Sequence, residues 1–209
     1  MAYRKTAQEK LDIISCLDKE YWARDFVIIG MDEAGRGPLA GPVVAAGVIM
    51  PSENLILGID DSKKISENKR ELLYEKIVEN ALEIGIGIVD NNVIDKLNIL
   101  NAARLAFKKA YDKIKSSSDF VLTDYITNLD IKGYKAIKKG DSKSYSIAAA
   151  SIVAKVTRDR IMREYDMIYP KYGFAKHKGY GTKQHMQAIE EFGATKIHRL
   201  SFIKNILYR

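Results

Sequence analysis

The chain has 209 residues, of which 46% are hydrophobic and 29% charged, and this composition excludes a disordered or fibrous protein. No stretch approaches the roughly 18 consecutive apolar residues of a membrane span, and the first residues lack the apolar core of a signal peptide. We therefore expect a cytoplasmic protein that contacts no membrane. Cys16, the single cysteine, fits a reducing compartment and is interpreted as a small apolar residue on a helix.

The predicted elements, in chain order, alternate between helices and short apolar runs. A polar helix over residues 4–24 comes first. Four apolar runs of strand length follow, and helices lie between and after them. The runs are residues 26–31, 43–50, 84–88 and 120–123, and the helices are 66–80, about 103–114, 144–165 and 182–192. This alternation predicts a single α/β domain over residues 1–209, with an N-terminal helix within 1–25 and a helical C-terminal extension from about 166.

Small residues predict one close contact between a helix and the sheet. Gly85 and Gly87 share one face of the third apolar run. The helix over 144–165 carries Ala148, Ala149, Ala150 and Ala154. We expect this helix to approach the sheet at those two glycines. Ser66 and Thr182 are candidate N-caps of their helices, and Gly193 closes the last predicted helix.

Charge is distributed unevenly along the chain. The whole sequence carries 34 Lys and Arg against 27 Asp and Glu, a net charge of +7. Residues 1–130 have a net charge of −4, whereas residues 131–209 have a net charge of +11. The basic second part indicates a polyanionic partner such as nucleic acid, whose phosphates bind clustered Lys and Arg. A solvated basic surface that aids solubility explains the same charge, and charge alone does not decide between them.

Carboxylates follow two of the predicted strands. Asp32 and Glu33 come directly after the first apolar run, and Asp124 follows the fourth. Buried carboxylates are costly unless they are paired or bind a metal. Because neighbours on a regular strand point to opposite faces, the strand must end or bend near Glu33 if both acids serve one site. Asp141 precedes the helix over 144–165, where it can cap that helix and still reach the sheet edge.

Together, four carboxylates from three segments form an all-oxygen ligand set, which suits Mg²⁺ or Mn²⁺. Zinc would favour His or Cys, and His177, His185 and His198 lie outside these segments. Two cations about 3.5–4 Å apart would activate a water and stabilise the leaving oxygen of a phosphodiester. A single Asp at a strand end is more often a turn or cap residue. The joint occurrence with the motifs below favours the metal site.

A Gly-Arg-Gly sequence follows the first acid pair. Gly35 and Gly37 allow the backbone to approach a ligand closely, and Arg36 can bind a phosphate bidentately. Two similar tetrads, Asp61–Lys64 and Asp141–Ser144, precede helices. Helix N-termini bind phosphates, but simple N-capping explains either tetrad when it is taken alone.

A basic loop over 176–182 places Tyr180 between two glycines. An exposed aromatic ring in a basic loop can stack on a base or a sugar, whereas the alternative is a plain turn before a helix. Tyr172 and Phe174, which lie nearby, are interpreted as packing residues.

These motifs together resemble ribonuclease HII, the bacterial type 2 RNase H. The opening signature is Asp32-Glu33-Ala34-Gly35-Arg36-Gly37-Pro38-Leu39-Ala40-Gly41-Pro42. The resemblance continues through Asp61–Lys64, Lys139–Ser144, Ala148–Lys155 and His177–Thr182, and it spans about residues 26–202. It implies an RNase H-like fold, with a central five-stranded mixed sheet flanked by helices and a helical C-terminal part.

The resemblance also implies an activity and the residues that carry it. The family cuts the RNA strand of RNA/DNA hybrids and nicks 5′ to single ribonucleotides in duplex DNA, leaving 5′-phosphate and 3′-hydroxyl ends. By motif, the catalytic carboxylates and metal ligands are Asp32, Glu33, Asp124 and Asp141. The loop that recognises the ribose 2′-hydroxyl is Gly35, Arg36 and Gly37, and Tyr180 packs against the sugar at the RNA–DNA junction. Lys64 and Lys143 are candidate phosphate contacts.

One position departs from the family pattern. The family usually has Gly after the third acid, whereas this chain has Tyr125, which can alter the local turn. The related HIII type has an additional N-terminal domain, for which the residues before the first strand leave no room. A non-catalytic RNA/DNA hybrid-binding protein would explain the charge and Tyr180 without needing four acids. A scaffolding α/β protein would leave the acids and the Gly-Arg-Gly sequence unexplained. We expect a monomer, because nothing in the sequence indicates an oligomer interface.

Overall fold

The computed structural model describes residues 6–207 of the chain. Its strands are β1 (Ile28–Ala34), β2 (Val43–Ile49), β3 (Glu83–Val89), β4 (Phe120–Asp124) and β5 (Tyr134–Ile137). Its helices are α1 (Ala7–Trp22), α2 (Glu67–Asn80), α3 (Asn91–Leu97), α4 (Ile99–Tyr111), α5 (Tyr145–Ile168), α6 (Phe174–His177), α7 (Lys183–Phe192) and α8 (Leu200–Leu207). A short 3₁₀ turn, Gly140–Ser142, precedes α5. Residues 4 and 5 of the predicted first helix lie outside the described residues.

All five strands form one mixed sheet in the order β3-β2-β1-β4-β5. β1 pairs antiparallel with β2, which pairs antiparallel with β3. On its other side β1 pairs parallel with β4, and β4 pairs parallel with β5. The sheet therefore brings the carboxyl ends of β1 and β4 to the same edge. The expected five-stranded mixed sheet flanked by helices is confirmed.

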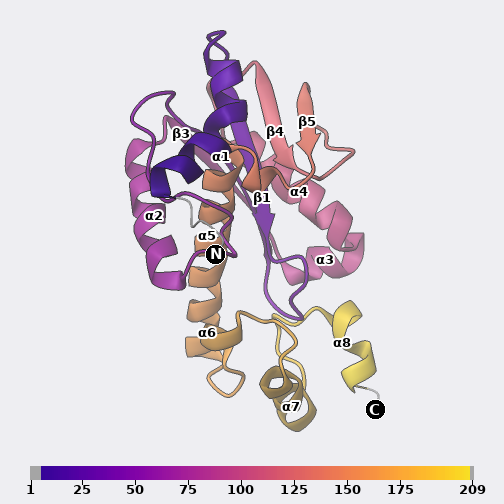
Figure 1. Ribbon diagram of the computed structural model, residues 1–209. Coiled ribbons are helices and arrows are strands. Elements are labelled where there is room, and N and C mark those ends of the chain that lie inside the picture. Colours follow the sequence, from indigo (N-terminus) through magenta and orange to yellow (C-terminus); the bar gives the residue numbers. More distant parts are fainter. Residues whose placement is uncertain (1–5, 208–209) are drawn as a thin grey trace.

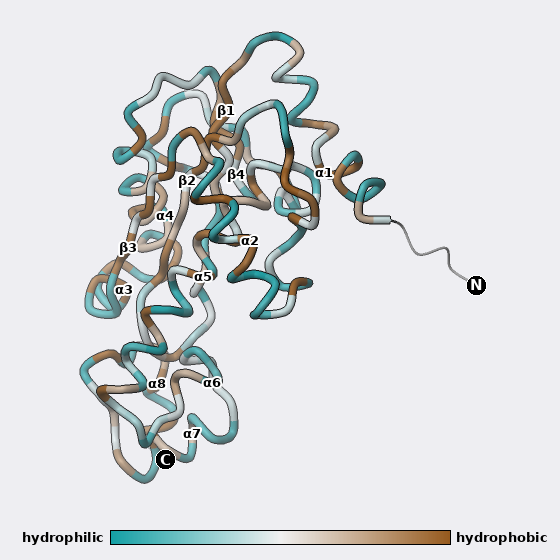
Figure 2. The backbone as a smooth tube through the Cα atoms, turned by 90° about the vertical axis from the view of Figure 1, so that its left-hand side faces the viewer, coloured by the Kyte–Doolittle hydropathy of each residue, from teal (hydrophilic) through white to brown (hydrophobic). Residues whose placement is uncertain are grey.

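Helices cover both faces of this sheet (Figure 1). One face packs against α1, α2 and α5 through a core that contains Val48, Ile77 and Ile152. The opposite face packs against α3 and α4, with Phe107 and Ile94 in its core. Hydrophobic stretches follow the strands, whereas the helices alternate along their length (Figure 2). The helices α1, α2 and α4 thus bury one face and leave the other in water, whereas the first ten residues of α5, Tyr145–Ala154, are buried on all sides.

The C-terminal elements α6, α7 and α8 have a core of their own. It contains Tyr172, Phe174 and Ile189, together with Met162 from the end of α5. Tyr172 and Phe174 stack with their ring centroids 5.5 Å apart, so their predicted packing role is confirmed. Among residues 6–207, no helix is both long and apolar enough to cross a bilayer. Cys16 lies on α1, as predicted, but its side chain is exposed and packs in no core.

The pattern of apolar runs did not identify β5 or α3. β5 was not predicted from its residues because Lys135 interrupts the short apolar sequence Tyr134–Ile137, which lies within a basic stretch. The helix predicted from about residue 103 begins earlier, at Ile99, and the seven-residue α3 precedes it. Asn98 separates α3 from α4 with a φ of 66°, and its side chain accepts from the N–H groups of Leu100 and Asn101. Asn tolerates this left-handed backbone and caps the second helix.

Gly85 and Gly87 do allow a helix to approach, but the helix is α4, not the predicted α5. A Cβ on Gly87 would lie 2.0 Å from the carbonyl oxygen of Ala106, and one on Gly85 would lie 2.1 Å from that of Ala110. The alanine-rich α5 packs on the opposite face, where it meets Gly30 of β1. The prediction failed because alternation along a strand defines a face without indicating which helix covers it.

We predict that replacing Gly30 by alanine destabilises the protein by about 3 kcal/mol or prevents folding. Its Cβ would lie 2.1 Å from the backbone carbon of Ser146, and neither backbone can yield without moving α5 off the sheet. Chemical denaturation monitored by circular dichroism measures the change. Gly181→Ala is the control, because its Cβ would meet only the Leu39 side chain, at 3.2 Å. Equal stability of the two variants would contradict this packing.

Candidate active site

Parallel pairing of β1 with β4 sets two carboxylates side by side. Met31 pairs with Thr123 in this register, so the next residues along the two strands are Asp32 and Asp124. Asp32 is buried and Asp124 is half-buried. The Oδ1 atom of Asp32 accepts from the N–H of Glu33 at 2.8 Å, which fixes its side chain at the end of the strand. Two acids far apart in the sequence thus meet through sheet register alone.

Asp141 joins them from the 3₁₀ turn before α5. The N–H of Gly140 donates to Oδ1 of Asp124 at 2.7 Å and ties this turn to β4. A Cβ on Gly140 would lie 3.3 Å from the Cα atom of Asp124, so glycine allows the close approach. The prediction that Asp141 caps the following helix is wrong. Ser144 caps α5 instead, and Asp18 from α1 accepts from its first N–H groups.

The three carboxylates form a compact cluster. Ligand oxygens of Asp32, Asp124 and Asp141 all lie within 4.8 Å of one another. Burial raises the pKa of Asp32 well above its usual value, and the charges of Glu33 and Asp124 raise it further. Burial and the charge of Asp124 also raise the pKa of Asp141. Like charges held this closely fit a divalent cation, and an all-oxygen set suits Mg²⁺ or Mn²⁺.

Glu33 lies beside this cluster but is not one of its three members. β1 ends at Ala34, directly after Glu33, which agrees with the expectation that the strand ends near Glu33. Its Oε1 atom accepts from Arg36 at 3.2 Å, and its buried Oε2 atom has no hydrogen-bond partner. Burial raises the pKa of Glu33, although Arg36 opposes this rise. A buried carboxylate oxygen without a hydrogen-bond partner is suited to bind a cation. The role of Glu33 as a metal ligand stays a prediction.

The lysines of the first tetrad point in different directions. Lys63 places its Nζ atom 3.7 Å from Oδ2 of Asp141, whereas Lys64 lies 3.5 Å from Asp61 and 3.8 Å from Asp60. Although burial lowers the pKa of Lys63, the surrounding carboxylates, led by Asp32, produce a net rise. Lys63 was missed as a site residue, since adjacent lysines in a loop give no signal of which one faces inward.

A loop over 35–42 leaves the end of β1 and is held by two buried arginines. The Arg199 guanidinium donates to the carbonyl oxygens of Gly35, Arg36, Gly41 and Pro42 at 2.6–3.1 Å. Arg158 of α5 donates to those of Ala40 and Pro42 at 3.1 and 2.9 Å. Burial lowers the pKa of Arg199 to about 9 and that of Arg158 to about 10, so both remain charged at neutral pH.

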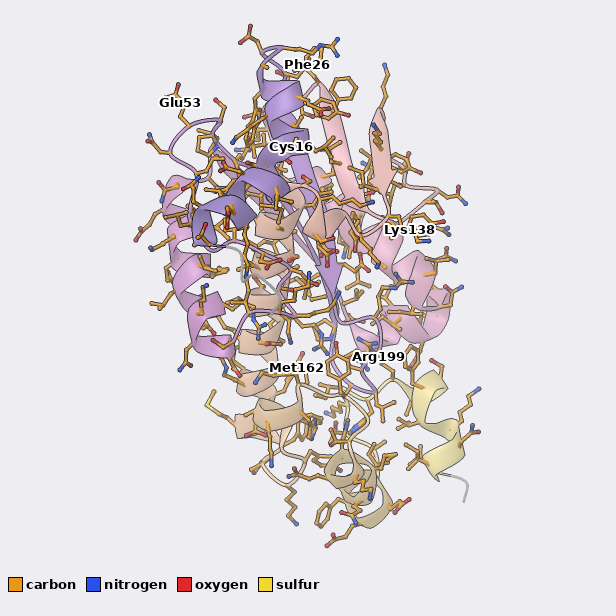
Figure 3. The ribbon with its side chains drawn as sticks, in the orientation of Figure 1. Cys16, Phe26, Glu53, Lys138, Met162 and Arg199 are labelled. Carbon is orange, nitrogen blue, oxygen red and sulfur yellow. The ribbon has the colours of Figure 1, made fainter. Side chains whose placement is uncertain are left out.

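These arginines fix the loop in space. Arg199 lies where the carboxyl end of β1 meets the C-terminal helices (Figure 3). Gly35 has a φ of 99°, and a Cβ there would lie 2.2 Å from Nε of Arg158, so both conformation and space require glycine. Neither arginine was predicted, because a buried Arg bonded to backbone carbonyls leaves no mark in the sequence.

Tyr180 faces the same loop from the C-terminal part. Its ring is 45% exposed, as predicted, and a Cβ on Gly37 would lie 3.7 Å from its Cε1 atom. The N–H of Leu39 donates to the carbonyl of Gly179 at 2.8 Å and joins the two segments. The structure therefore brings the Gly35–Gly37 loop and Tyr180 together, next to the carboxylates at the end of β1.

Three histidines, His177, His185 and His198, pack together next to the segment that carries Tyr180. The N–H of Thr195 donates to Nδ1 of His198, so Nε2 of His198 carries the proton that His185 Nε2 accepts at 3.0 Å. Nδ1 of His185 then donates to the carbonyl of Tyr180 at 2.9 Å. His177 stacks on His185 with ring centroids 4.5 Å apart. Among the described residues, the acid cluster includes none of these histidines.

Three further positions that the sequence singled out, Tyr125, Arg36 and Lys143, are exposed. Tyr125, which follows Asp124, is 63% exposed, and its N–H donates to the carbonyl of Ile137 at 3.1 Å. The Tyr side chain thus points to solvent while its backbone continues the sheet pairing, and Asp124 still reaches the cluster. Arg36 and Lys143 are both exposed, Arg36 in the loop and Lys143 two residues after Asp141.

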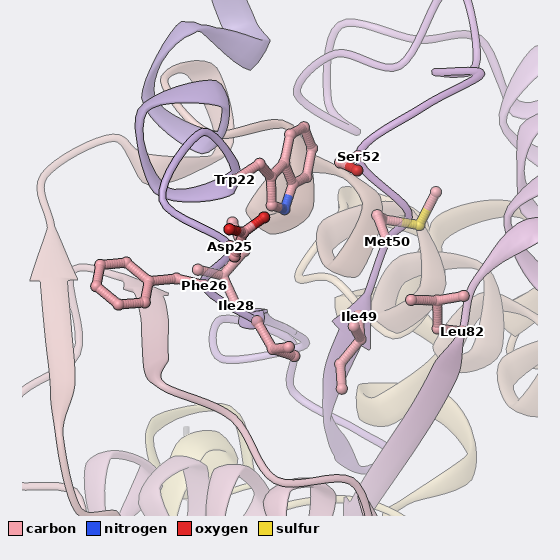
Figure 4. A pocket seen from close by; sticks show the side chains of 9 residues that line it. Trp22, Asp25, Phe26, Ile28, Ile49, Met50, Ser52 and Leu82 are labelled. Carbon is pink, nitrogen blue, oxygen red and sulfur yellow. The ribbon is translucent and has the colours of Figure 1, made fainter.

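A hollow of about 240 Å³ lies at the opposite end of the sheet (Figure 4). Trp22, Ile28, Met50 and Leu82 help to line it, at the start of β1 and the end of β2. The carboxylates lie at the other end of β1, so the hollow is separate from the acid cluster.

Comparisons with known proteins agree with this arrangement. Residues 29–205 match the family model of ribonuclease HII. Ribonuclease HII of Clostridioides difficile (strain 630) is 55% identical over 203 residues, covering 96% of this chain and 79% of the relative. Ribonuclease HII of Acetivibrio thermocellus is 51% identical over 210 residues, covering 99% and 81%.

The fold agrees as well. The crystal structure of ribonuclease H2 from Pyrococcus horikoshii OT3 matches with a TM-score of 0.73 at 25% identity, over 86% of this chain and 96% of that chain. The resemblance seen in the motifs is confirmed. The chain belongs to the ribonuclease HII family and is therefore a ribonuclease H, an endonuclease that uses divalent metal ions.

Proposed function

We propose that this enzyme cuts the RNA strand of RNA/DNA hybrids and also nicks duplex DNA on the 5′ side of a single embedded ribonucleotide, leaving 5′-phosphate and 3′-hydroxyl ends. One observation carries the proposal: the buried acid cluster adjoins a glycine loop that faces an exposed tyrosine. The acids supply hydrolysis. The loop and the ring supply a means to recognise a sugar without reading a base.

The carboxylates of Asp32, Asp124 and Asp141 would hold the metal ions, with Glu33 as the fourth ligand through its unpaired Oε2 atom. Mg²⁺ and Mn²⁺ both suit this set. When bound by these residues, two such ions would supply the activation of a water for in-line attack and the stabilisation of the leaving oxygen. Lys63, close to Asp141, adds a positive charge at the edge where the scissile phosphate would lie.

We assign recognition of the ribose 2′-hydroxyl to the loop formed by residues 35–37. Arg199 already engages the carbonyl oxygens of Gly35 and Arg36, so we assign the recognition to the N–H groups of the loop and to Gly37. Tyr180 would pack against the same sugar. Arg36, Lys64 and Lys143 are exposed side chains that can contact phosphates on either side.

The remaining expectations are part of the same proposal. The protein acts in the cytoplasm as a monomer, with RNA/DNA hybrid and ribonucleotide-containing duplex DNA as partners. All of residues 1–209 act as one catalytic domain, because α1 and the C-terminal helices both pack on elements that build the site.

A labelled DNA duplex with one ribonucleotide tests the proposal directly. We expect a single nick 5′ to the ribonucleotide in Mg²⁺ or Mn²⁺, and none with EDTA. Cleavage of a long hybrid without that nick would keep the nuclease and remove the junction role of the loop and Tyr180.

We predict that Asp124→Asn lowers kcat by about 10³-fold or more while hybrid binding persists, because the carboxylate serves the chemistry and not the affinity. Single-turnover cleavage and fluorescence anisotropy measure the two quantities. Asp112→Asn, which changes an exposed acid of a surface ion pair, serves as the control. Full activity of Asp124→Asn would refute the assignment.

We predict that Asp32→Asn stabilises the metal-free protein at pH 8 by roughly 1–2 kcal/mol. The pKa of Asp32 lies above its unfolded value, so its ionisation opposes folding at pH 8. This cost is fully present above the folded-state pKa, shrinks as the pH falls from there toward the lower unfolded-state pKa, and is absent below the unfolded-state pKa, so the difference from wild type should shrink over the same range. Thermal unfolding with and without Mn²⁺ measures both effects. Asp12→Asn on α1 is the exposed control, and a destabilised Asp32→Asn would contradict the prediction.

We predict that Tyr180→Ala slows nicking at a single ribonucleotide by about 10- to 100-fold, the value of one stacking contact. Tyr180→Phe should retain most of the rate, because the ring and not the hydroxyl contacts the sugar. Cleavage rates on the single-ribonucleotide duplex and on a long hybrid give the comparison. Unchanged nicking by the alanine variant would exclude this role.

A further inference from the structure

Helix α1 lies before residue 29, where the match to the family model begins. A side chain of α1, that of Asp18, nevertheless binds the start of α5, which follows the turn with Asp141. Asp18 is completely buried. Its Oδ2 atom accepts from the N–H of Tyr145 at 2.9 Å, and its Oδ1 atom accepts from the N–H of Ser146 at 2.9 Å. The hydroxyl of Ser144 also donates to Oδ1, at 3.2 Å. A single carboxylate thus binds three consecutive residues at the start of α5.

These three residues follow Asp141 almost directly. The chain between them folds tightly, since the N–H groups of Lys143 and Ser144 both donate to the carbonyl of Gly140 at 2.9 Å. At the other end of this turn, Gly140 donates to Asp124 at 2.7 Å. The turn that carries Asp141 is therefore fixed on one side by an acid of the cluster and on the other by Asp18.

Buried aromatic residues support the contact between Asp18 and the start of α5. Tyr145, which Asp18 binds, is buried, and its hydroxyl accepts from the N–H of Ile56 at 2.8 Å. Trp22 of α1 packs edge-on against the Tyr145 ring at 6.3 Å. Burial raises the pKa of the Asp18 carboxyl, while the bonds from Ser146, Ser144 and Tyr145 oppose that rise. A carboxylate at the N-terminus of a helix is also favoured by the helix dipole.

Ser144 already caps α5 through Ile147 at 3.3 Å, so the helix does not need Asp18 merely to begin. What Asp18 adds is a link across the core from α1 to the turn that presents Asp141. We propose that Asp18 is a positioning residue that holds the Asp141 carboxylate against those of Asp32 and Asp124. The inference rests on the proposed function, in which Asp141 is a metal ligand.

Metal binding to the otherwise unliganded protein is the test. Isothermal titration with Mn²⁺ compares wild type, Asp18→Ala, Asp18→Asn and Asp141→Asn. We expect Asp18→Ala to bind Mn²⁺ roughly 10- to 100-fold more weakly, as loss of a group that orients a ligand does. Asp18→Asn keeps one acceptor oxygen and should fall between. Raising the Mn²⁺ concentration should restore much of the kcat of Asp18→Ala, with KM for the duplex unchanged.

Asp90→Ala is the matched control. Asp90 also caps a helix, accepting from the N–H of Val93 at 2.9 Å, but it belongs to α3 and not to the acid cluster. We expect it to lower thermal stability without changing Mn²⁺ affinity. If Asp18→Ala and Asp18→Asn lose stability in the same way but bind Mn²⁺ like wild type, Asp18 only stabilises the fold and the proposal is overturned.

Two further measurements separate the remaining outcomes. Wild-type Mn²⁺ affinity in Asp141→Asn would overturn the ligand role of Asp141, which is a failure of the proposed function and not of the Asp18 contact. If Asp18→Ala does not fold, Asp18→Asn and Ser144→Ala each remove part of the same contact. We then expect faster hydrogen exchange at Tyr145 and Ser146 together with weaker Mn²⁺ binding in both, and unchanged binding would refute the proposal.

Discussion

Electrostatic repulsion within the acid cluster is the constraint that the surrounding structure has to overcome. Three carboxylates lie within 4.8 Å of one another, and burial together with their mutual charge raises the pKa of Asp32. Such a cluster does not form by itself in water. It is imposed by contacts that are unrelated to the acids: the β1–β4 register, the close approach that Gly140 allows, and the anchor of α5 on Asp18. The repulsion lowers the stability of the fold, and the same arrangement provides a preorganised cation site.

Two buried positive charges lie close to the acid cluster and are stabilised by dipoles instead of by opposite charges. Arg158 and Arg199 are buried against the loop after β1, where backbone carbonyl oxygens accept their N–H groups and no carboxylate of residues 6–207 does. Carbonyl dipoles stabilise these cations without neutralising them. The loop gains a fixed shape, and two positive charges remain close to the surface that would receive a polyanion. This also explains why the C-terminal residues cannot be separated from the site, since Arg199 lies among them.

The sequence predicted what local patterns encode. Apolar runs that end in an acid identified β1, β4 and two members of the acid cluster, Asp32 and Asp124, and the predicted Thr182 cap lies at the start of its helix. What it could not show depends on tertiary placement. The face of the sheet that α4 covers, the choice of Lys63 over Lys64 beside Asp141, and the partners of Arg199 each follow from how distant segments meet. For β5, pairing with β4 outweighed a local pattern that reads as a basic loop.

Covalent spacing links the two halves of the proposed reaction. Asp32 and Gly35 are three residues apart at the end of one strand, so the distance between the site of hydrolysis and the sugar-reading loop is limited to about 10 Å. Arg199 holds the loop in place, and the pairing of β1 with β4 holds Asp32 and Asp124 in place. The loop and the acids therefore keep a fixed distance from each other. A 2′-hydroxyl bound at the loop would therefore select which neighbouring phosphate reaches the carboxylates. Cleavage at a fixed position beside a single ribonucleotide then needs no recognition of base identity, because the geometry of β1 and its loop determines it.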